Sequence, residues 1–191
     1  MKKLFMVLAL IMVCGFIANA DAITFKPGID GNALNSLNHT RYFTWGIDWT
    51  PVPEDEIISA KFVFTDLYNN DNESNQLYVH LLESADPGVT SKYDGQLGGD
   101  NFAGQGIELF TLFNVPMSPA MTYSYTLTDS ELATFVSYVS DGNFGFGIDP
   151  DCHFYNAGVK FQVTALPEPG TIMMLGMGLC GVAYYARRKR S

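Results

Sequence analysis

Two aspartates stand one residue apart in the most distinctive stretch of the chain. Asp149 and Asp151 flank Pro150 and follow the segment 143–148 (NFGFGI). We expect that segment to be a strand and Pro150 to hold the two carboxylates in a rigid turn at its end. Hard oxygen donors of this kind suit Ca²⁺, which takes six to eight oxygen ligands. The alternative is an Asx-type turn, in which the aspartates accept backbone N–H bonds and bind no metal.

A cysteine and a histidine, Cys152 and His153, follow directly and are the residue types of a nucleophile and its base. Neighbouring residues of a strand point to opposite faces, so we do not expect a catalytic dyad. The acidic loop 69–73 (NNDNE) also looks like a calcium loop, but it lacks the glycine at position six and the glutamate at position twelve of an EF-hand. His80 alternates with apolar residues, which places it on the solvent side of a strand. With no common catalytic motif in the sequence either, we expect a protein that is not an enzyme.

Short strands separated by glycine, proline, asparagine and aspartate fill the middle of the chain. Residues 69–75 would close a hairpin, and residues 84–106 would form one long loop. Thr128 and Glu131 have the spacing of a capping box, which predicts one short helix. The pattern predicts an all-β fold, an antiparallel β-sandwich or jelly roll with that single helix. The expected strands are 41–49, 58–66, 76–83, 107–113, 121–127, 143–148 and 158–164.

Exposed tyrosines on such a fold would bind sugars by stacking against their rings. The candidates are Tyr93, in the long loop, and Tyr155, together with Tyr42 and Tyr78. A loop tip is a common place for a binding site. A jelly-roll domain with an acidic turn is similar in outline to carbohydrate-binding modules, a likeness that rests on fold analogy alone. The alternative is that these tyrosines are partly buried packing residues.

Acidic residues dominate the middle of this 191-residue chain. Residues 23–166 hold five basic and eighteen acidic side chains, a net formal charge of −13. Such a domain repels nucleic acid, so we expect no nucleic-acid partner. Of the three cysteines, Cys14 and Cys180 fall in the terminal segments, which leaves Cys152 without a disulfide partner in the domain. The fold must therefore be stable from its core alone, or with the help of a metal.

The N-terminus has the pattern of a secretory signal peptide. A basic start is followed by the uncharged segment 4–17, and Ala18 and Ala20 supply the small residues before a cut. We predict a signal peptide over residues 1–20, removed by signal peptidase after Ala20. A second cleavage register ends at Ala22, and an uncleaved anchor is the alternative.

The C-terminal segment 166–191 combines three features in order. It opens with Pro167, Glu168, Pro169 and Gly170, and the two prolines hold the backbone extended. Residues 171–186 carry no charge and would span about 24 Å as a helix, which is short of a hydrocarbon core of about 30 Å. The basic cluster 187–190 would stay on the cytoplasmic side. We expect a marginal transmembrane helix that holds the domain outside the membrane.

The order of these three features resembles the PEP-CTERM sorting signal of Gram-negative bacteria. The resemblance covers about the last 26 residues. It implies that an exosortase, a membrane enzyme, processes the tail near its Pro-Glu-Pro motif. It also implies an inner-membrane intermediate and then a place at the cell surface or in the extracellular or biofilm matrix, often beside exopolysaccharide systems. The resemblance implies nothing about the activity of the domain.

Two other interpretations of the tail stay open. A Gram-positive sortase signal requires Leu-Pro-x-Thr-Gly, and Pro169 stands where the threonine should be. A single-pass anchor that is never processed needs only the apolar segment, which is able to insert.

The domain between the terminal segments, residues 23–165, has two candidate functions. The first is a non-enzymatic exported domain that binds exopolysaccharide or another matrix component. The second is a secreted hydrolase acting on polysaccharide, which requires two carboxylates in a cleft, about 5 Å or about 6.5–9.5 Å apart.

Overall fold

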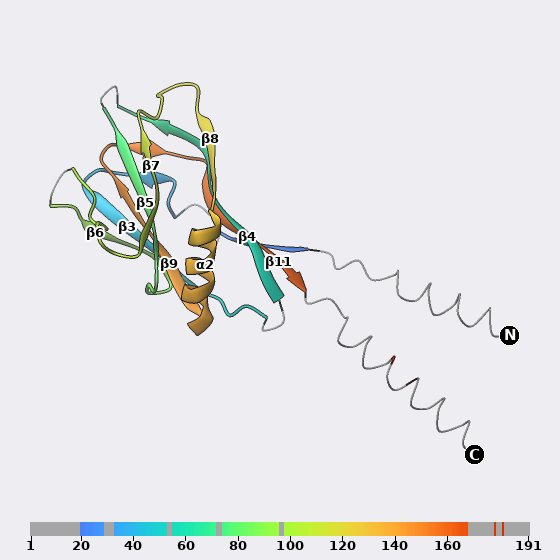
Figure 1. Ribbon diagram of the computed structural model, residues 1–191. Helices are drawn as coiled ribbons and strands as arrows, with labels where there is room; N and C mark the ends of the chain where they lie inside the picture. The colour runs from blue at the N-terminus through green and yellow to red at the C-terminus, as the bar shows by residue number, and fades with distance from the viewer. Residues whose placement is uncertain are drawn as a thin grey trace, which may run out of the picture.

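The computed structural model describes residues 20–28, 33–52, 55–71, 74–95 and 98–167, together with residues 178 and 181. This part of the chain is mostly β, in antiparallel sheets with one short α-helix, as the sequence predicts (Figure 1). Ala18, the sorting residues after Pro167 and all but two residues of the expected tail helix lie outside the described residues. No helix among the described residues is long and apolar enough to cross a membrane.

The six-stranded sheet is built around one long strand, β4 (Asp55–Asn69). Its order is β1 (Asp21–Phe25), β11 (Gly158–Pro167), β4, β10 (Phe154–Tyr155) and β2 (Ser36–Leu37), and β8 (Met121–Thr126) also pairs with β4. Strand β1 runs antiparallel to β11, with Asp21 opposite Ala165. The beginning of the first strand therefore lies beside the residues that lead into the C-terminal motif.

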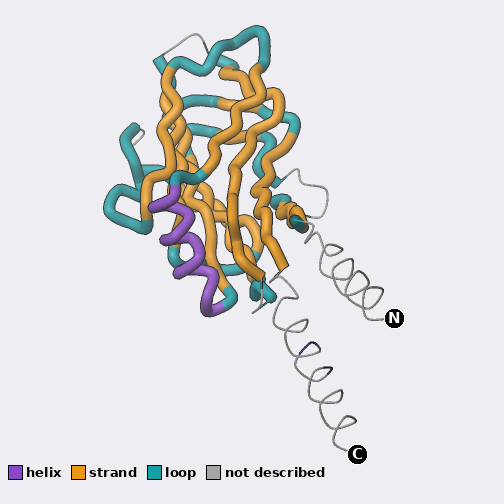
Figure 2. Tube along the Cα trace, turned by 45° about the vertical axis from the view of Figure 1, so that its right-hand side comes forward, coloured by secondary structure: helices purple, strands orange, loops and turns teal. Residues whose placement is uncertain are grey.

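The five-stranded sheet forms the second layer. Its order is β6 (Gly88–Tyr93), β3 (Arg41–Asp48), β9 (Asn143–Pro150), β5 (Gln76–Leu82) and β7 (Ile107–Phe113). The order β1-β11-β4-β8 in one sheet and β3-β9-β5-β7 in the other is that of a jelly roll, in which the chain passes repeatedly between two layers. Figure 2 shows these layers, with the helix alongside them.

The core lies between the two sheets and is rich in phenylalanine. Phe144, Phe146 and Ile148 alternate along β9, point inward and are fully buried. Phe62 and Phe161 meet them from the six-stranded sheet. The ring of Phe146 lies 4.9 Å from that of Phe62 and 4.8 Å from that of Phe161, measured between centroids. These contacts give the two layers an apolar, closely packed interface.

Helix α2 (Asp129–Tyr138) closes one end of the core. The Thr128 side chain accepts a hydrogen bond from the Glu131 backbone, and the Glu131 carboxylate accepts one from the Thr128 backbone, so the expected capping box is present. Phe135 is fully buried and packs against Phe144 and Phe161, one from each sheet. The 3-10 turn η1 (Val139–Asp141) then leads into β9.

Two expectations about connections are wrong. Strands β4 and β5 belong to different sheets, so residues 69–75 cross between the layers and do not close a hairpin. Residues 84–106 are not one loop, because β6 pairs with β3 inside that stretch. Alternation of apolar residues shows which side chains share a face, but it does not show which sheet a strand joins. Along β6 every residue except Val89 is exposed, so the strand has no apolar pattern to detect.

Candidate functional site

The outer face of the five-stranded sheet carries glycines and polar side chains. Gly147 on β9 lies opposite Thr44 on β3 and His80 on β5, and His80 in turn lies opposite Glu108 on β7. Asp149 is two residues further along β9 and projects to the same face. Residues paired across antiparallel strands share a face, so the sheet brings together side chains that are far apart in the sequence.

Two connections lie against this outer face, and we call them the 83–87 loop and the 94–106 loop. A Cβ at Gly147 would lie 2.6 Å from the ring of Phe102, and a Cβ at Gly46 would lie 2.1 Å from the carbonyl oxygen of Asp86. Both distances are far below van der Waals contact. The glycines therefore allow the two loops to rest directly on the sheet.

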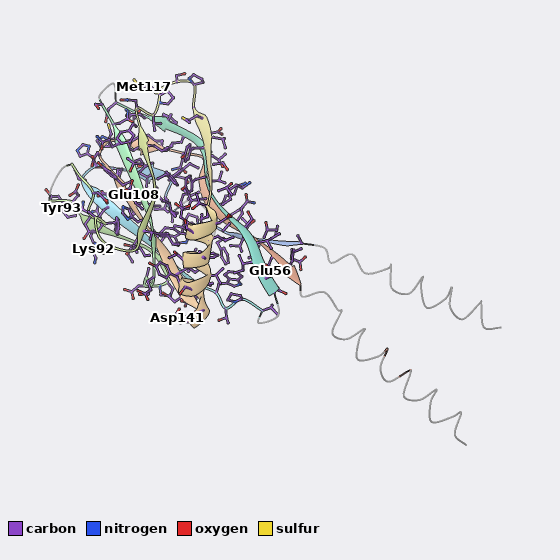
Figure 3. The ribbon with its side chains drawn as sticks, in the orientation of Figure 1. Glu56, Lys92, Tyr93, Glu108, Met117 and Asp141 are labelled. Atoms are coloured by element: carbon purple, nitrogen blue, oxygen red, sulfur yellow. The ribbon has the colours of Figure 1, made fainter. Side chains whose placement is uncertain are left out.

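A groove of about 700 Å³ opens on the same face between the two loops. Tyr42 lies in it with its ring at right angles to that of Phe102, and the centroids are 5.5 Å apart. Figure 3 shows Lys92 and Tyr93 on the β6 side of the sheet. The lining residues offer mainly hydroxyl, amide and aromatic groups, and they include Tyr42, Thr44, Thr90, Lys92, Phe102 and Gln105.

Asp149 lies fully buried beneath the 94–106 loop. One carboxylate oxygen, Oδ2, accepts hydrogen bonds from the backbone N–H of Asn101 at 2.6 Å and from its side-chain amide at 3.0 Å. The other oxygen, Oδ1, is buried and has no hydrogen-bond partner among the described residues. Burial raises the pKa of Asp149 to about 6, the charges of Asp94 and Asp151 add to the rise, and the bonds from Asn101 oppose it.

Asp151 repeats this arrangement two residues later. Its Oδ2 accepts a hydrogen bond from the backbone N–H of Gly99 at 3.2 Å, and its Oδ1 is buried without a hydrogen-bond partner within the described ranges. Burial raises its pKa, as do the charges of Asp94 and Asp100, against the hydrogen bond from Gly99. Both aspartates thus accept backbone N–H bonds, as an Asx-type turn would require. The donors, however, belong to a loop about fifty positions away in the sequence, and each aspartate accepts these bonds with one oxygen. Strand β9 extends through Pro150, so Asp149 lies within the strand and not in a turn.

A histidine and two further carboxylates lie next to these aspartates. His80 contacts the Gln105 carbonyl through Nδ1 at 3.2 Å and the Asp100 carboxylate through Nε2 at 2.9 Å. Glu108, labelled in Figure 3, completes a set whose ligand atoms all lie within 4.8 Å of one another. The expectation that His80 faces solvent is wrong, because the 94–106 loop covers it and leaves 3% of the residue exposed. Its position on the outer face is as predicted.

Cys152 and His153 converge on a third residue. His153 Nδ1 lies 2.7 Å from the Asp71 carboxylate, and Cys152 Sγ lies 3.6 Å from it. The hydrogen bond from His153 lowers the pKa of Asp71. Burial, together with the charge of Asp71, raises the pKa of the Cys152 thiol, which opposes the thiolate that a nucleophile requires.

The structure does not bring the two tyrosine candidates together. Tyr93 is 72% exposed at the end of β6, whereas Tyr155 lies on β10 of the other sheet with its ring stacked on Tyr68. Ala20, at the expected cleavage point, directly precedes β1, and Pro167, the first sorting residue, ends β11.

The sequence interpretation missed the roles of Asp94 and Asp100, and of Phe102 in the groove. These residues lie in a stretch without periodicity, and their positions follow from the contacts of the 94–106 loop. The glycines of β9 were the available signal, since a glycine inside a strand often marks a close approach by another part of the chain.

Comparisons with known proteins give one match that bears on function. No curated protein matches the chain. Two solved structures of a latent aurone synthase (polyphenol oxidase), one from natural source and one recombinant, are 10% and 8% identical to it, with TM-scores of 0.43 and 0.41. The similarity covers 76% and 77% of this chain and 28% of each of the others, and it carries no argument. The model of one family, the PEP-CTERM protein-sorting motif, matches residues 165–190, so the tail carries the sorting signal that its residues predicted.

Proposed function

We propose that this chain is an exported surface or matrix protein whose domain binds a neutral polysaccharide in the outer-face groove, without catalysing a reaction. The sorting motif supports export, recognition by an exosortase and a cell-surface or extracellular destination in a Gram-negative bacterium. The observation that carries the binding proposal is the groove itself, because a destination alone does not specify a ligand.

The chemistry of the groove suits a sugar chain. Threonine hydroxyls and amide groups match the hydroxyls of a glycan, and the half-buried ring of Tyr42 offers an apolar face for a sugar ring. The net charge of −13 over residues 23–166 repels polyanions, which favours a neutral polysaccharide over an acidic one.

The distribution of carboxylates supports binding over hydrolysis. Among the described residues that line the groove, Asp86 is the acidic one. A glycosidase needs a pair of carboxylates on opposite sides of the scissile bond. Asp149 and Asp151 lie beneath the 94–106 loop, where they hold backbone N–H groups.

Binding is tested by affinity electrophoresis of the full chain, in detergent, through gels that contain neutral or uronic-acid polysaccharides. We expect retardation by a neutral polymer, and Tyr42→Ala to weaken it about tenfold, equal to about 1.4 kcal/mol. Tyr155→Ala, an exposed tyrosine on the other sheet, is the matched control and should bind normally. Binding that survives Tyr42→Ala and is lost in Tyr155→Ala would move the site to the other sheet. Release of reducing sugar from the polymer would support the hydrolase instead.

Processing of the tail is tested by intact-mass measurement of the protein recovered from the cell surface or the medium. We expect the mature chain to lack Arg187, Arg188, Lys189 and Arg190, because exosortase processing occurs near the Pro-Glu-Pro motif. A surface protein that retains all four residues would support the permanent anchor. This measurement is independent of whether the groove binds a glycan.

A further inference from the structure

Two buried carboxylate oxygens at the end of β9, Oδ1 of Asp149 and Oδ1 of Asp151, have no hydrogen-bond partner in the part of the chain that the structure describes. Asp149 is fully buried, and each aspartate uses its other oxygen to bind the 94–106 loop. We propose that a Ca²⁺ ion binds here, coordinated by Asp149 and Asp151 between the strand and the loop. The site does not depend on glycan binding in the groove.

The carboxylates around this point carry negative charge that a bound cation would neutralise. Asp94, which is fully buried, acts electrostatically on both Asp149 and Asp151, and Asp100 acts on Asp151. Among the residues that the structure describes, the ion pairs are His80–Asp100 and His153–Asp71, and neither includes Asp149 or Asp151. Buried charges are normally paired or bound to a metal, because removing them from water otherwise costs several kcal/mol. A divalent cation would compensate this group of carboxylates.

The donor atoms favour calcium over a transition metal. Asp149 and Asp151 offer oxygen alone, and Ca²⁺ accepts carboxylates, backbone carbonyls and water in a flexible shell. The neighbouring set of His80, Asp100 and Glu108 mixes nitrogen with oxygen, which suits Zn²⁺. Both ring nitrogens of His80 already have partners, whereas the two Oδ1 atoms have none among the residues that the structure describes. The unpartnered oxygens therefore indicate the site.

Calcium at this point would fasten the 94–106 loop to the sheet. Gly99 and Asn101 of the loop donate N–H bonds to the same two carboxylates, and Phe102, next in the chain, forms part of the groove. Calcium sites of extracellular modules bind with a Kd of about 0.1–1 mM. A site of that affinity would be filled outside the cell, where the sorting signal directs the protein.

The site is tested on the full chain in detergent, stripped with a chelator and then followed by calorimetry and thermal unfolding as Ca²⁺ is added. At Ca²⁺ about a hundredfold above Kd, we expect Tm to rise by about 5 °C or more. Asp149→Asn should abolish the heat of binding and this rise, while its Tm in chelator equals or exceeds that of the original chain. A purely structural aspartate would instead lower Tm in both conditions. Asp151→Asn is the second variant if the first does not fold, and Glu56→Gln, at an exposed position of β4 in the other sheet, is the control that should bind Ca²⁺ normally.

Three results would overturn the proposal. The first is no heat and no rise in Tm with Ca²⁺ up to about 10 mM, ten times the upper end of the extracellular range. The second is Ca²⁺ binding that survives in both Asp149→Asn and Asp151→Asn. The third is stabilisation by Zn²⁺ alone that Glu108→Gln removes, which would assign the metal to the set around His80.

Discussion

The two faces of strand β9 are both buried, but by different parts of the molecule. The inner face presents Phe144, Phe146 and Ile148 to the other sheet. The outer face presents Gly145, Gly147 and Asp149 to loops of the same chain. The inner face is apolar throughout and holds the two layers together. The outer face encloses carboxylates under a loop. Burial there raises the pKa of these carboxylates and does not stabilise the fold.

The largest effect is expected on the inner face. Phe146→Ala removes a ring that contacts Trp45, Phe62 and Phe161, and it should lower the free energy of unfolding by about 4 kcal/mol. A fall in Tm of about 10 °C follows for a chain of this size. The matched control is Phe113→Ala, whose ring is exposed and which should change stability by less than about 0.5 kcal/mol. Similar losses in the two variants would show that the inner face is not the main source of stability.

On the outer face, the next effect comes from the charge of Asp149. Its pKa is raised from 3.8 to about 6 in the folded chain, so between these values the folded state holds a proton that the unfolded chain has released. Stability should therefore fall as pH rises through this window, by about 3 kcal/mol in the presence of chelator. Chemical unfolding at a series of pH values measures it. Asp149→Asn should remove this part of the slope, and an unchanged slope would mean that Asp149 is not the group responsible.

A smaller loss is expected where the loop meets the sheet. Gly147→Ala places a Cβ against the ring of Phe102 and should cost about 2 kcal/mol through overpacking. Combining it with Phe102→Ala removes the clash, so the double variant should be more stable than the sum of the two single losses predicts. Thermal unfolding of the four proteins of this cycle gives the coupling. If the losses of stability in the two single variants simply add, contact with the loop is not the reason for a glycine at position 147.

The inner face of β9 was largely predictable from the sequence, whereas the outer face was not. Apolar alternation identifies the strand, and the Thr128–Glu131 spacing identifies the helix, because both signals depend on residues close together in the chain. The expectation that His80 faces solvent was wrong because the burial of His80 depends on residues that are distant in the chain. Its strand pattern gives the correct face, but whether that face meets water depends on a loop whose position no local pattern reveals.

The candidate site was also predictable from the sequence in part. Asp149 and Asp151 attract attention through their spacing and through Pro150 between them. Their partners Asn101 and Gly99 come from the 94–106 loop and become visible when the chain is folded. The sequence therefore points to the two carboxylates at the end of β9 and does not reveal the loop that covers them.

The smallest expected effect is a difference in stability between variants of two histidine–carboxylate pairs whose distances are similar. His80–Asp100 measures 2.9 Å under the outer-face loop, and its side chains are 4% and 14% exposed. His153–Asp71 measures 2.7 Å, with side chains 31% and 38% exposed. Asp100→Asn should cost about 1.5 kcal/mol, because it weakens a buried charge-assisted bond. Asp71→Asn should lower Tm much less at neutral pH, since water screens this half-exposed pair and leaves little of the stabilisation that the lowered pKa of Asp71 reflects. Equal losses of stability in the two variants would mean that burial under the 94–106 loop does not strengthen the histidine–carboxylate interaction.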